Sequence, residues 1–550
     1  MSERPGARRH GRTVRARVAF LRVMAPLCGV AIGATPGAVR AQASRLWRPD
    51  DRALLTDFSY VTAIAASQDM VFAATPTALV VYDRLSLQWR ETAVPPLNFP
   101  GGGVVSMVAD PLDDTAWLAA GAQWFEYRPL THEWQSGLLP GGAAAVVLDS
   151  DNPTSGAWFD TGAGWVQVGP GGFVGVPGTP PAPGHRIAPL GIADLRRVAP
   201  AYPTALARIA TDADLRSYQL TGAAMAPVDQ QIYLATDGNG AFRLDPVGYA
   251  VEQLPSGLLA PGAGGMTVAH GRVCVGTDVL GAAGALVGAS GRRGVTCVSD
   301  DLSEITPLES NPRDAAVGPF VRDVAIDERG GVWAASDAGV VRLGRGRAVR
   351  LTSAEGLPSS DARVLAADSG GVWVGTSAGL AFVDDADRPT VEGATQFGAA
   401  VGALAVSRDT LWVGSALGLL ALPRGARQPV PAVGGPALRL PVVDLAVRGD
   451  TIVLLAETRV LWRTGGVWSD VGAGTPNVGR FVAVAMDGDG VWVAGTNGVA
   501  WLAPRAGTWV TMTSPDDVPQ PVFDIAAAGR WVWVATAHGL VRYDKRALER

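Results

Sequence analysis

Short apolar runs recur along this chain, and turns rich in glycine and aspartate separate them. Six segments align almost without gaps, and each has an apolar run, a turn and a second apolar run. They read GVWAASDAGVVRL, GVWVGTSAGLAFV, TLWVGSALGLLAL, TIVLLAETRVLWR, GVWVAGTNGVAWL and WVWVATAHGLVRY. Apolar runs this short, bounded by turn residues, predict β-strands rather than helices.

One position in each copy, here called the anchor, usually carries a large side chain. In these six copies the anchors are Trp333, Trp373, Trp412, Val453, Trp492 and Trp533, spaced by 40, 39, 41, 39 and 41 residues. Five looser copies precede them, with anchors at Phe72, Trp117, Trp158, Tyr233 and Cys274. A second tryptophan follows three of the anchors by 17 residues, at Trp89, Trp134 and Trp509. The 75 residues between Trp158 and Tyr233 leave room for an insertion or a twelfth copy.

Each copy has space for four short strands, which is the pattern of a blade of a β-propeller. We therefore predict an all-β propeller of eleven or twelve blades, with the anchors packed between neighbouring blades. Because one ring usually has four to eight blades, two tandem rings are favoured, and one oversized ring is the alternative. The expected domains are 44–260 and 261–550, the second with about seven blades, and the boundary falls near 255–265. The last copy lacks a fourth strand, which SRLWRPDD at residues 44–51 is expected to supply.

The first 43 residues have the three parts of a secretory signal peptide. A basic stretch precedes the apolar run Val23–Ala34, and Ala41-Gln42-Ala43 has the small residues of a cleavage site. We expect cleavage near Ala43 and an extracytoplasmic protein, periplasmic or secreted. The net charge of −5 becomes −12 once the eight arginines and one glutamate of residues 1–43 are removed. Such acidity argues against nucleic acid as a partner, and no later run is apolar enough for a membrane span.

Two irregular segments interrupt the repeats. Residues 179–216 begin with TPPAPG and then have a partly helical pattern, so we expect a decorated loop or an interdomain piece. Cys274 is an anchor, and Cys297 aligns with Arg342 of the next copy, which is the expected cross-strand neighbour of Trp333. The two cysteines should therefore face each other, and an oxidising compartment favours a disulfide between them. Free buried thiols are the alternative.

One stretch resembles the repeats of the two-component-regulator propeller family. LTSAEGLPSSDARVLAADSGGVWVGTSAGLAFV, residues 351–383, contains the Gly-Leu-Pro-Ser loop and the W-x-G-T-x-x-G-L strand pair of that family. A weaker likeness extends over residues 60–543. The resemblance implies an extracytoplasmic sensor-type propeller, and glycan-derived molecules are one class of ligand that such propellers serve. The kinase and transmembrane helix that often accompany such propellers have no counterpart in this sequence.

Two sets of polar residues are candidate binding sites. Loops between blades and turns between second and third strands should share one face. That face would gather Asp237, Asn239, Asp337, Glu355, Asp361, Arg459, Asn497 and His538. The alternative is that these residues only satisfy the backbone of tight turns.

The second set lies nine or ten residues before the anchors, at the start of the innermost strand. It comprises Asp323, Arg363, Ala403, Asp444, Ala483 and Asp524. Three carboxylates and a guanidinium around the mouth of the channel would suit a cation or a polar ligand. The alternative is that each aspartate accepts backbone N–H groups of the next blade.

Catalytic motifs are scarce. The four histidines after residue 43 have no metal-ligand spacing, and no nucleophile elbow or phosphate-binding loop stands out. We therefore expect no cofactor, apart from a structural or channel-bound cation, and a ligand-binding or sensor-like module rather than an enzyme. A protein-interaction scaffold and a glycan lyase or hydrolase are the alternatives.

Overall fold

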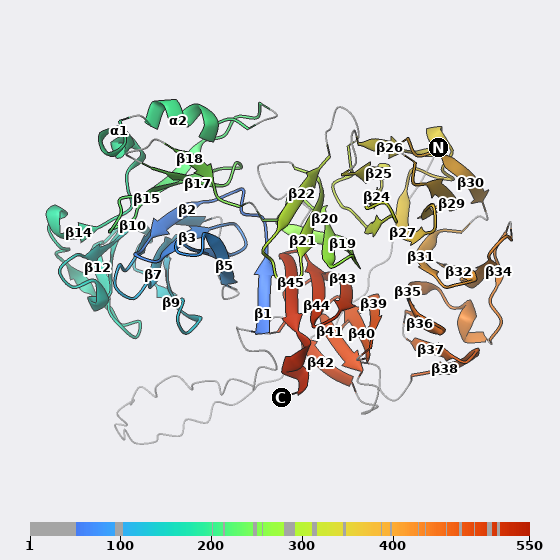
Figure 1. Cartoon of the computed structure of the whole chain (residues 1–550). Helices are drawn as coiled ribbons and strands as arrows, with labels where there is room; N and C mark the ends of the chain where they lie inside the picture. Colours follow the sequence, from blue (N-terminus) through green and yellow to red (C-terminus); the bar gives the residue numbers. More distant parts are fainter. Residues whose placement is uncertain are drawn as a thin grey trace, which may run out of the picture. The chain divides into compact units, whose positions relative to one another are not determined.

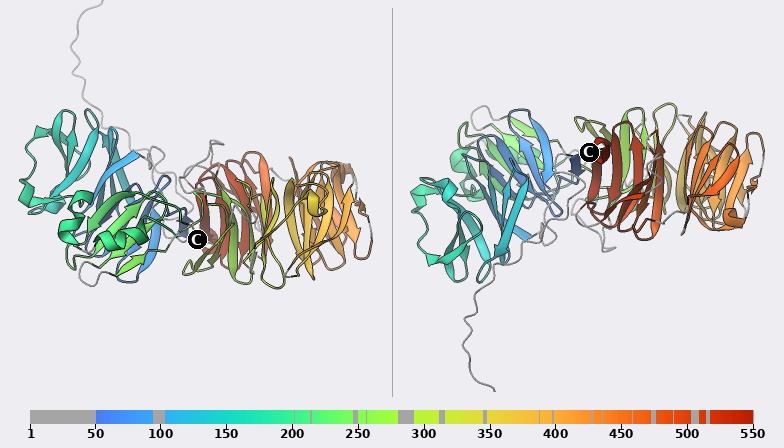
Figure 2. Two further views of the ribbon diagram at one scale, coloured as in Figure 1. Left: turned by 90° about the horizontal axis from the view of Figure 1, so that it is seen from above. Right: turned by 90° about the horizontal axis from the view of Figure 1, so that it is seen from below.

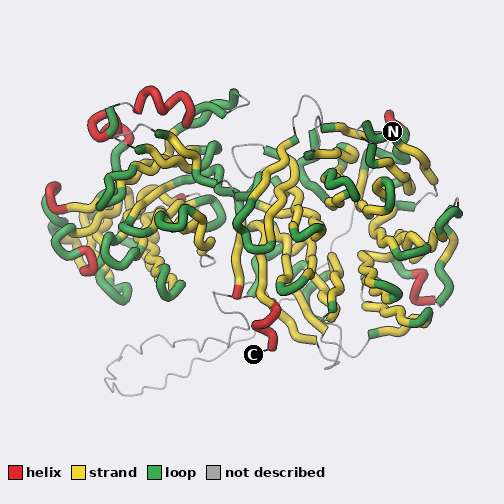
Figure 3. The backbone as a smooth tube through the Cα atoms, viewed as in Figure 1, coloured by secondary structure: helices red, strands yellow, loops and turns green. Residues whose placement is uncertain are grey.

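The computed structural model describes residues 51–93, 103–200, 202–212, 215–245, 250–255, 257–279, 292–310, 316–344, 348–386, 388–396, 399–426, 428–434, 436–457, 459–471, 476–488, 490–502, 509–513 and 517–549. The predicted signal peptide and its cleavage site lie outside these residues. Strands dominate the described chain, and helices are short (Figure 3).

Eleven antiparallel sheets are formed by the described residues, and ten of them have the four-stranded order of a propeller blade. The first four sheets contain β2 (Ala63–Ala66), β3 (Met70–Ala74), β4 (Leu79–Asp83) and β5 (Gln88–Ala93); β6 (Val104–Ala109), β7 (Ala116–Ala120), β8 (Gln123–Arg128) and β9 (Glu133–Leu138); β10 (Ala143–Asp149), β11 (Ala157–Thr161), β12 (Gly164–Val168), β13 (Val174–Gly178) and β14 (Arg186–Ile187); and β15 (Leu220–Met225), β16 (Ile232–Thr236), β17 (Ala241–Leu244) and β18 (Val251–Gln253).

The next four sheets contain β19 (Gly262–Ala269), β20 (Arg272–Asp278), β21 (Gly294–Ser299) and β22 (Ile305–Glu309); β23 (Asp323–Ile326), β24 (Val332–Ser336), β25 (Gly339–Leu343) and β26 (Val349–Leu351); β27 (Ala362–Asp368), β28 (Gly371–Thr376), β29 (Gly379–Asp384) and β30 (Val391–Gln396); and β31 (Val401–Val406), β32 (Thr410–Ser415), β33 (Gly418–Pro423) and β34 (Val430–Pro431).

The last three sheets contain β35 (Val442–Arg448), β36 (Thr451–Ala456), β37 (Val460–Thr464) and β38 (Val467–Asp470); β39 (Phe481–Asp487), β40 (Gly490–Gly495), β41 (Gly498–Leu502) and β42 (Trp509–Thr513); and β43 (Val522–Ala528), β44 (Trp531–Thr536) and β45 (Gly539–Asp544) with β1 (Arg52–Leu55).

Seven sheets form a closed cycle, here called the seven-sheet ring (Figure 1). Their innermost strands contact one another in the order β19, β23, β27, β31, β35, β39 and β43, and β43 returns to β19. In the views of Figure 2 the green-to-red sheets of the ring stand side by side as blades. A closed cycle of seven excludes the single oversized ring.

The ring is closed by a strand from the other end of the chain. β1 pairs antiparallel with β45, with Leu54 opposite Val541 and Leu55 opposite Leu540. A strand supplied from the N-terminus was predicted at residues 44–51, and the structure corrects its position to 52–55. Leu54 and Leu55 of this strand are buried, and residues 44–50 of the predicted segment lie outside the described residues.

The remaining four sheets form what we call the four-sheet arc. Their innermost strands are neighbours in the order β15, β2, β6 and β10. At one end, β14 pairs with the inner edge of β10, through Leu148 and Ile187. At the other end, α1 (Leu195–Val198) and α2 (Tyr202–Ile209) pack their apolar residues on the sheet of β15–β18. The insertion predicted at 179–216 thus provides the helices and the extra strand.

The anchors explain why neighbouring sheets hold together. Trp333 is buried against Leu365 and Val374 of the next sheet, and Trp492 is buried against Ile525 and Val534 of the sheet after it. Each large ring removes much apolar surface from water between two sheets. The sequence therefore repeats about every 40 residues because each blade contributes one such interface.

Candidate functional site

The three predicted channel aspartates connect neighbouring blades through backbone hydrogen bonds. Asp323 accepts the N–H of Leu365 at 2.7 Å, Asp444 accepts that of Val484 at 2.7 Å, and Asp524 accepts that of Met266 at 2.8 Å. In each case the donor belongs to the innermost strand of the next sheet.

The other oxygen of each carboxylate accepts the N–H of the following residue, at 2.7 to 2.8 Å. This is the structural alternative that the sequence left open. The bond from Asp524 spans the joint at which β43 meets β19, and so completes the ring.

Burial raises the pKa of all three carboxyl groups. The pKa of Asp323 rises to about 7 and that of Asp444 to about 6, because burial outweighs the hydrogen bonds from backbone N–H groups. The pKa of Asp524 lies well above its usual value, through burial and through repulsion from Asp323 and Asp444. All three residues lie on innermost strands of the seven-sheet ring. Within the described residues, no group of three or more His, Cys, Asp or Glu side chains is arranged to hold a metal ion.

The fourth member of the predicted channel set has a different place. The register of β27 against β28 shifts between Ala362 and Val364, so Arg363 is the extra residue of a β-bulge. Val364 pairs with Gly375 and so takes the place that Asp323, Asp444 and Asp524 hold in their sheets. Val364 stands nine residues before its anchor, as Asp444 and Asp524 do, whereas Arg363 stands ten. A spacing of ten fits Asp323, because the turn between β23 and β24 is one residue longer. The guanidinium of Arg363 bonds Asp361 instead, at 3.1 Å.

The predicted loop face exists in the ring. Turns between second and third strands form hydrogen bonds with the loops between blades. The N–H of Ser377 donates to the carbonyl of Asp361, and the N–H of Thr496 donates to the carbonyl of Arg480, both at 2.9 Å. Asp361 also accepts hydrogen bonds from Arg322 and Arg363. Burial raises the pKa of Asp361, but these bonds outweigh it and hold the pKa below its usual value.

Most of the other predicted face residues have local structural roles. Glu355 closes a capping box with Thr352, and hydrogen bonds from Thr352 lower its pKa. Asp237 accepts the N–H of Gln219 at 2.7 Å. Asn239 donates to the carbonyl of Ile209 at 2.9 Å, which ties its turn to the end of α2.

Asn497 and His538 are exposed on turns of neighbouring sheets, as are Asp337 and Arg459 on theirs. Partial burial lowers the pKa of the His538 imidazole. The structure therefore brings these residues to one face of the ring without joining them in one cluster. Asp237 and Asn239 belong to the four-sheet arc. Binding at this face stays a prediction.

A disulfide joins Cys274 and Cys297, which lie opposite each other on β20 and β21. Both are buried in the core that this sheet shares with β23–β25. The pair therefore replaces the packing that Trp333 and Arg342 provide in the next sheet. Part of the predicted inserted loop, 279–293, lies outside the described residues.

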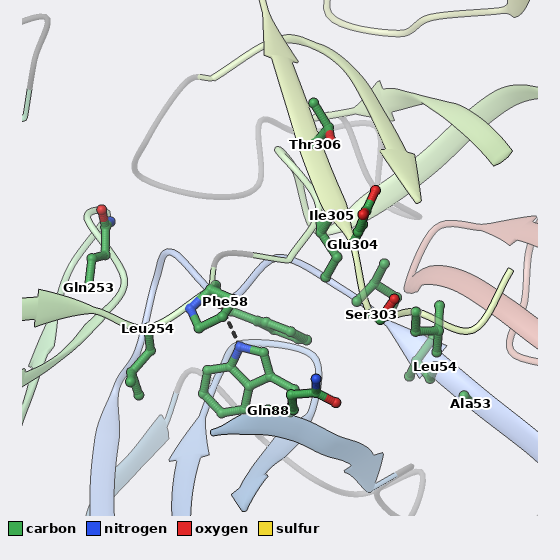
Figure 4. Close-up of a pocket in the computed structure, with 14 residues that line it drawn as sticks. Ala53, Leu54, Phe58, Gln88, Gln253, Leu254, Ser303, Glu304, Ile305 and Thr306 are labelled. Carbon is green, nitrogen blue, oxygen red and sulfur yellow. Dashed lines mark hydrogen bonds between the residues drawn. The ribbon is translucent and has the colours of Figure 1, made fainter. Parts of the chain in front are cut away.

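One concave site, here called the Trp89 pocket, was not among the predicted sites (Figure 4). Its volume is about 530 Å³. It is lined by Ala53, Leu54, Leu55, Phe58, Gln88, Trp89, Gln253, Leu254, Pro255, Leu302, Ser303, Glu304, Ile305 and Thr306. These residues come from β1 and the segment after it, from the start of β5, from the end of β18 and the residues after it, and from the start of β22 with the turn before it. They do not come from the loop face on which the sequence analysis concentrated.

The indole of Trp89 is held in a fixed orientation at this pocket. Its Nε1 donates to the carbonyl of Pro255 at 2.5 Å. Its ring lies 5.0 Å from that of Phe58 and 5.1 Å from that of Tyr82. Around it, Figure 4 shows the polar ends of Gln88, Gln253 and Glu304 on different segments. The pocket thus has an aromatic and aliphatic floor with amide and carboxylate groups at its rim.

The sequence offered one signal for this site. Trp89 repeats at 17 residues after its anchor, as Trp134 and Trp509 do, and the pattern marks all three as fourth-strand residues. It does not separate the pocket tryptophan from the others, because much of the remaining wall comes from residues more than 160 positions away, such as Pro255 and Glu304.

No known family model matches this sequence, and no curated protein matches it. Among solved structures, a virginiamycin B lyase from Staphylococcus aureus bound to quinupristin is 15% identical, covers 52% of this chain and 94% of its own, and has a TM-score of 0.40.

The extracellular domain of a putative hybrid two-component system from B. thetaiotaomicron is 11% identical, covers 88% and 70%, and has a TM-score of 0.39. The β-propeller domain of Cps50 from Myceliophteria thermophila is 10% identical, covers 51% and 96%, and has a TM-score of 0.39. The chain is a multi-blade β-propeller. These similarities assign it no function, and membership of the two-component-regulator family stays a prediction.

Proposed function

We propose that this chain is an exported, non-catalytic β-propeller that binds a small amphipathic ligand in the Trp89 pocket. The observation that carries the proposal is the pocket itself. Its volume of about 530 Å³ falls in the range of small-molecule sites, and its lining combines aromatic and aliphatic surface with a few polar groups.

The lining defines the chemistry of the ligand. Trp89, Phe58, Leu254 and Ile305 offer apolar surface, whereas Gln88 and Gln253 offer both donors and acceptors. Glu304 is the acidic group of the lining, and no lining residue is basic. A neutral or cationic molecule with an apolar face and several hydrogen-bonding groups fits this wall. A strongly anionic molecule does not, because no lining residue is basic and the acidic group, Glu304, has only Arg272 among the described residues as a counter-charge, at 3.4 Å.

The disulfide supports export. Disulfides form and persist in oxidising compartments and are rare in the cytosol of most organisms. A Cys274–Cys297 bond therefore agrees with the signal peptide predicted at residues 1–43. In the described chain no helix has the length and apolar character that crossing a bilayer requires.

Thermal shift of residues 44–550 against neutral and cationic small molecules tests this function. A ligand that binds only the folded protein raises the melting temperature by mass action, by about 2.7 kcal/mol of stability at 100 times Kd. Trp89→Ala should abolish the shift for any ligand found.

Trp134→Ala is the matched control, since Trp134 is the equivalent fourth-strand residue of the next sheet and lies outside the pocket. A shift that survives Trp89→Ala and is lost in an Asp323→Ala/Asp444→Ala double variant would overturn the proposed site. A panel without any shift would favour the scaffold alternative.

A propeller hydrolase or lyase is the second candidate, because one observation favours it. Such an enzyme needs acids with perturbed pKa values, and the pKa values of Asp323, Asp444 and Asp524 are all raised. Against it, both oxygens of each carboxylate already accept backbone N–H groups. Turnover of a glycan or cyclic peptide that Asp444→Asn abolishes without unfolding the chain would establish this candidate.

A further inference from the structure

A second concave site lies on the last two sheets of the ring, away from the Trp89 pocket. We call it the Trp492 pocket. It has a volume of about 240 Å³ and is lined by Trp492, Trp501, Gly529, Arg530, Lys545, Arg546 and Leu548. Trp492 and Trp501 are cross-strand partners on β40 and β41, and their rings stack 5.8 Å apart with an interplanar angle of 28°.

The indole of Trp492 lacks the hydrogen bond that three other anchor indoles make, and the indole of the anchor Trp533 lacks it too. In three sheets the anchor N–H donates to a residue in the turn before it. Trp333 bonds Asp327 at 2.8 Å, Trp373 bonds Asp368 at 3.1 Å, and Trp412 bonds Ser407 at 3.3 Å.

Asp487 stands five residues before Trp492, the same spacing as Asp368 before Trp373. Its carboxylate bonds the Lys545 ammonium instead. The Nε1 of Trp492, a fully buried residue, has no hydrogen-bond partner among the described residues. A buried donor without an acceptor costs about 1–3 kcal/mol, so an acceptor supplied from outside would be favourable.

The charges around the pocket also favour a ligand with hydrogen-bond acceptors. Three of the lining residues are cationic and none is acidic. Behind the wall, Asp544 pairs with Arg530 and Arg546, and Asp487 pairs with Lys545. Arg546 and Arg530 keep 62% and 47% of their side-chain surface exposed, so a ligand in solution can reach them.

We propose that the Trp492 pocket binds a small oxyanion, either free or as the phosphate or carboxylate group of a larger molecule. Every polar side-chain group of the lining is a donor: two indoles, two guanidinium groups and one ammonium. An acceptor-rich anion matches that wall, and the planar guanidinium groups suit a carboxylate or phosphate. Leu548 and Trp501 provide apolar surface for an attached ring. This site is separate from the Trp89 pocket, which favours neutral or cationic molecules, and does not depend on it.

Isothermal titration of residues 44–550 with inorganic phosphate, and separately with benzoate, tests the proposal. The titrations are run at low salt, because binding to exposed cations weakens with ionic strength. An Arg530→Gln/Arg546→Gln variant should bind about tenfold more weakly or worse.

Arg459→Gln/Arg463→Gln is the matched control and should bind as the parent chain does. Arg459 is a half-exposed arginine paired to Asp470 at 3.4 Å, and Arg463 lies over the ring of Trp412, as Arg530 lies over that of Trp531. Melting curves check that both variants fold.

Phosphate binding that the pocket variant alone loses would establish a site for free oxyanions. Benzoate binding without phosphate binding would establish a site for a carboxylate on an apolar ring. If neither probe binds at millimolar concentration, or if the control variant loses binding as much as the pocket variant, the proposal is wrong.

Discussion

The seven-sheet ring and the four-sheet arc are built from the same repeat, but at one position the last sheet of the arc differs from all the others. Two residues after the anchor, every sheet of the ring has a residue without a polar side chain, Gly276, Ala335, Gly375, Gly414, Leu455, Ala494 and Ala535. In the arc, three sheets have alanine there, but the sheet of β10–β14 has Asp160.

That sheet is the last of the arc, and its anchor Trp158 is only half-buried. A carboxylate is tolerated where no blade follows, so a single residue indicates where stacking stops. The ring has no such end, because β1 and Asp524 close its last joint.

Removing the apolar contacts of the closing strand should have the largest effect. Leu54 and Leu55 are 3% and 5% exposed. A Leu54→Ala/Leu55→Ala variant should lose about 4–8 kcal/mol of unfolding free energy, because each truncation leaves a cavity in a packed core. Ile187→Ala in β14 of the arc should cost less than about 1.5 kcal/mol, because Ile187 is half-buried. Urea denaturation measures both, and equal losses would show that the ring gains nothing special from β1.

Exchanging the residue two positions after the anchor should have the second largest effect on stability. Ala335→Asp places a carboxylate in a fully buried interface and should cost about 3–5 kcal/mol or prevent folding. The reverse change at the end of the arc, Asp160→Ala, should alter stability by about 0.5 kcal/mol or less. Melting temperatures of the two variants check this. A large loss for Asp160→Ala would mean that a blade does cover that face.

The polar bonds between blades should contribute less. Asp524→Ala leaves the N–H groups of Met266 and Ile525 without their acceptor, at a cost of about 2–3 kcal/mol at pH 5. Ser106 holds the same place in the arc and accepts a single N–H, that of Val146, at 3.1 Å. Ser106→Ala should therefore cost about 1 kcal/mol. Denaturation at pH 5 compares them, and a reversed order would contradict the role given to the channel carboxylates.

The smallest effect should be a dependence on pH. The pKa of Asp444 is about 6 in the folded chain against 3.8 for the free side chain. A raised pKa means that folding favours the protonated form of this carboxyl group. The stability it contributes is therefore fully present below pH 3.8 and is lost as the pH rises through about 6.

Asp444→Asn has no such titration. The variant should have a lower free energy of unfolding than the parent chain. This difference should shrink by about 1–2 kcal/mol between pH 4 and pH 8, because only the parent's carboxyl group ionises. Urea titrations across this range measure the difference, and a difference that grows with pH would reverse the sign of the argument.

Sequence alone predicted the fold because the anchor interface repeats with the blade. The regular spacing of the anchors from Trp333 to Trp533 predicted one sheet per repeat. The alignment of Cys297 with Arg342 predicted that the two cysteines lie opposite each other. Asp323, Asp444 and Asp524 stand at equivalent places of their sheets, and a binding role for them stays a prediction. Which of two roles they have could not be decided, because that depends on which N–H of the next blade lies within reach.

Other features could not be predicted because they depend on register or on contacts distant in sequence. Arg363 is a bulge residue, and Val364, nine residues before its anchor, holds the channel place. Gly265 takes the corresponding place in the first sheet of the ring. A Cβ there would lie 2.1 Å from the carbonyl oxygen of Arg322, so no aspartate fits. The Trp89 pocket needs walls from β1, β5, β18 and β22, which no local pattern connects.

The central claim is that a small ligand binds in the Trp89 pocket rather than at the channel. Soaking crystals of residues 44–550 in a library of neutral and cationic fragments tests it most directly. The account predicts fragments on the indole of Trp89 with hydrogen bonds to Gln88, Gln253 or Glu304. Fragments that gather instead around Asp323, Asp444 and Asp524 in the channel, with the Trp89 pocket empty, would contradict it.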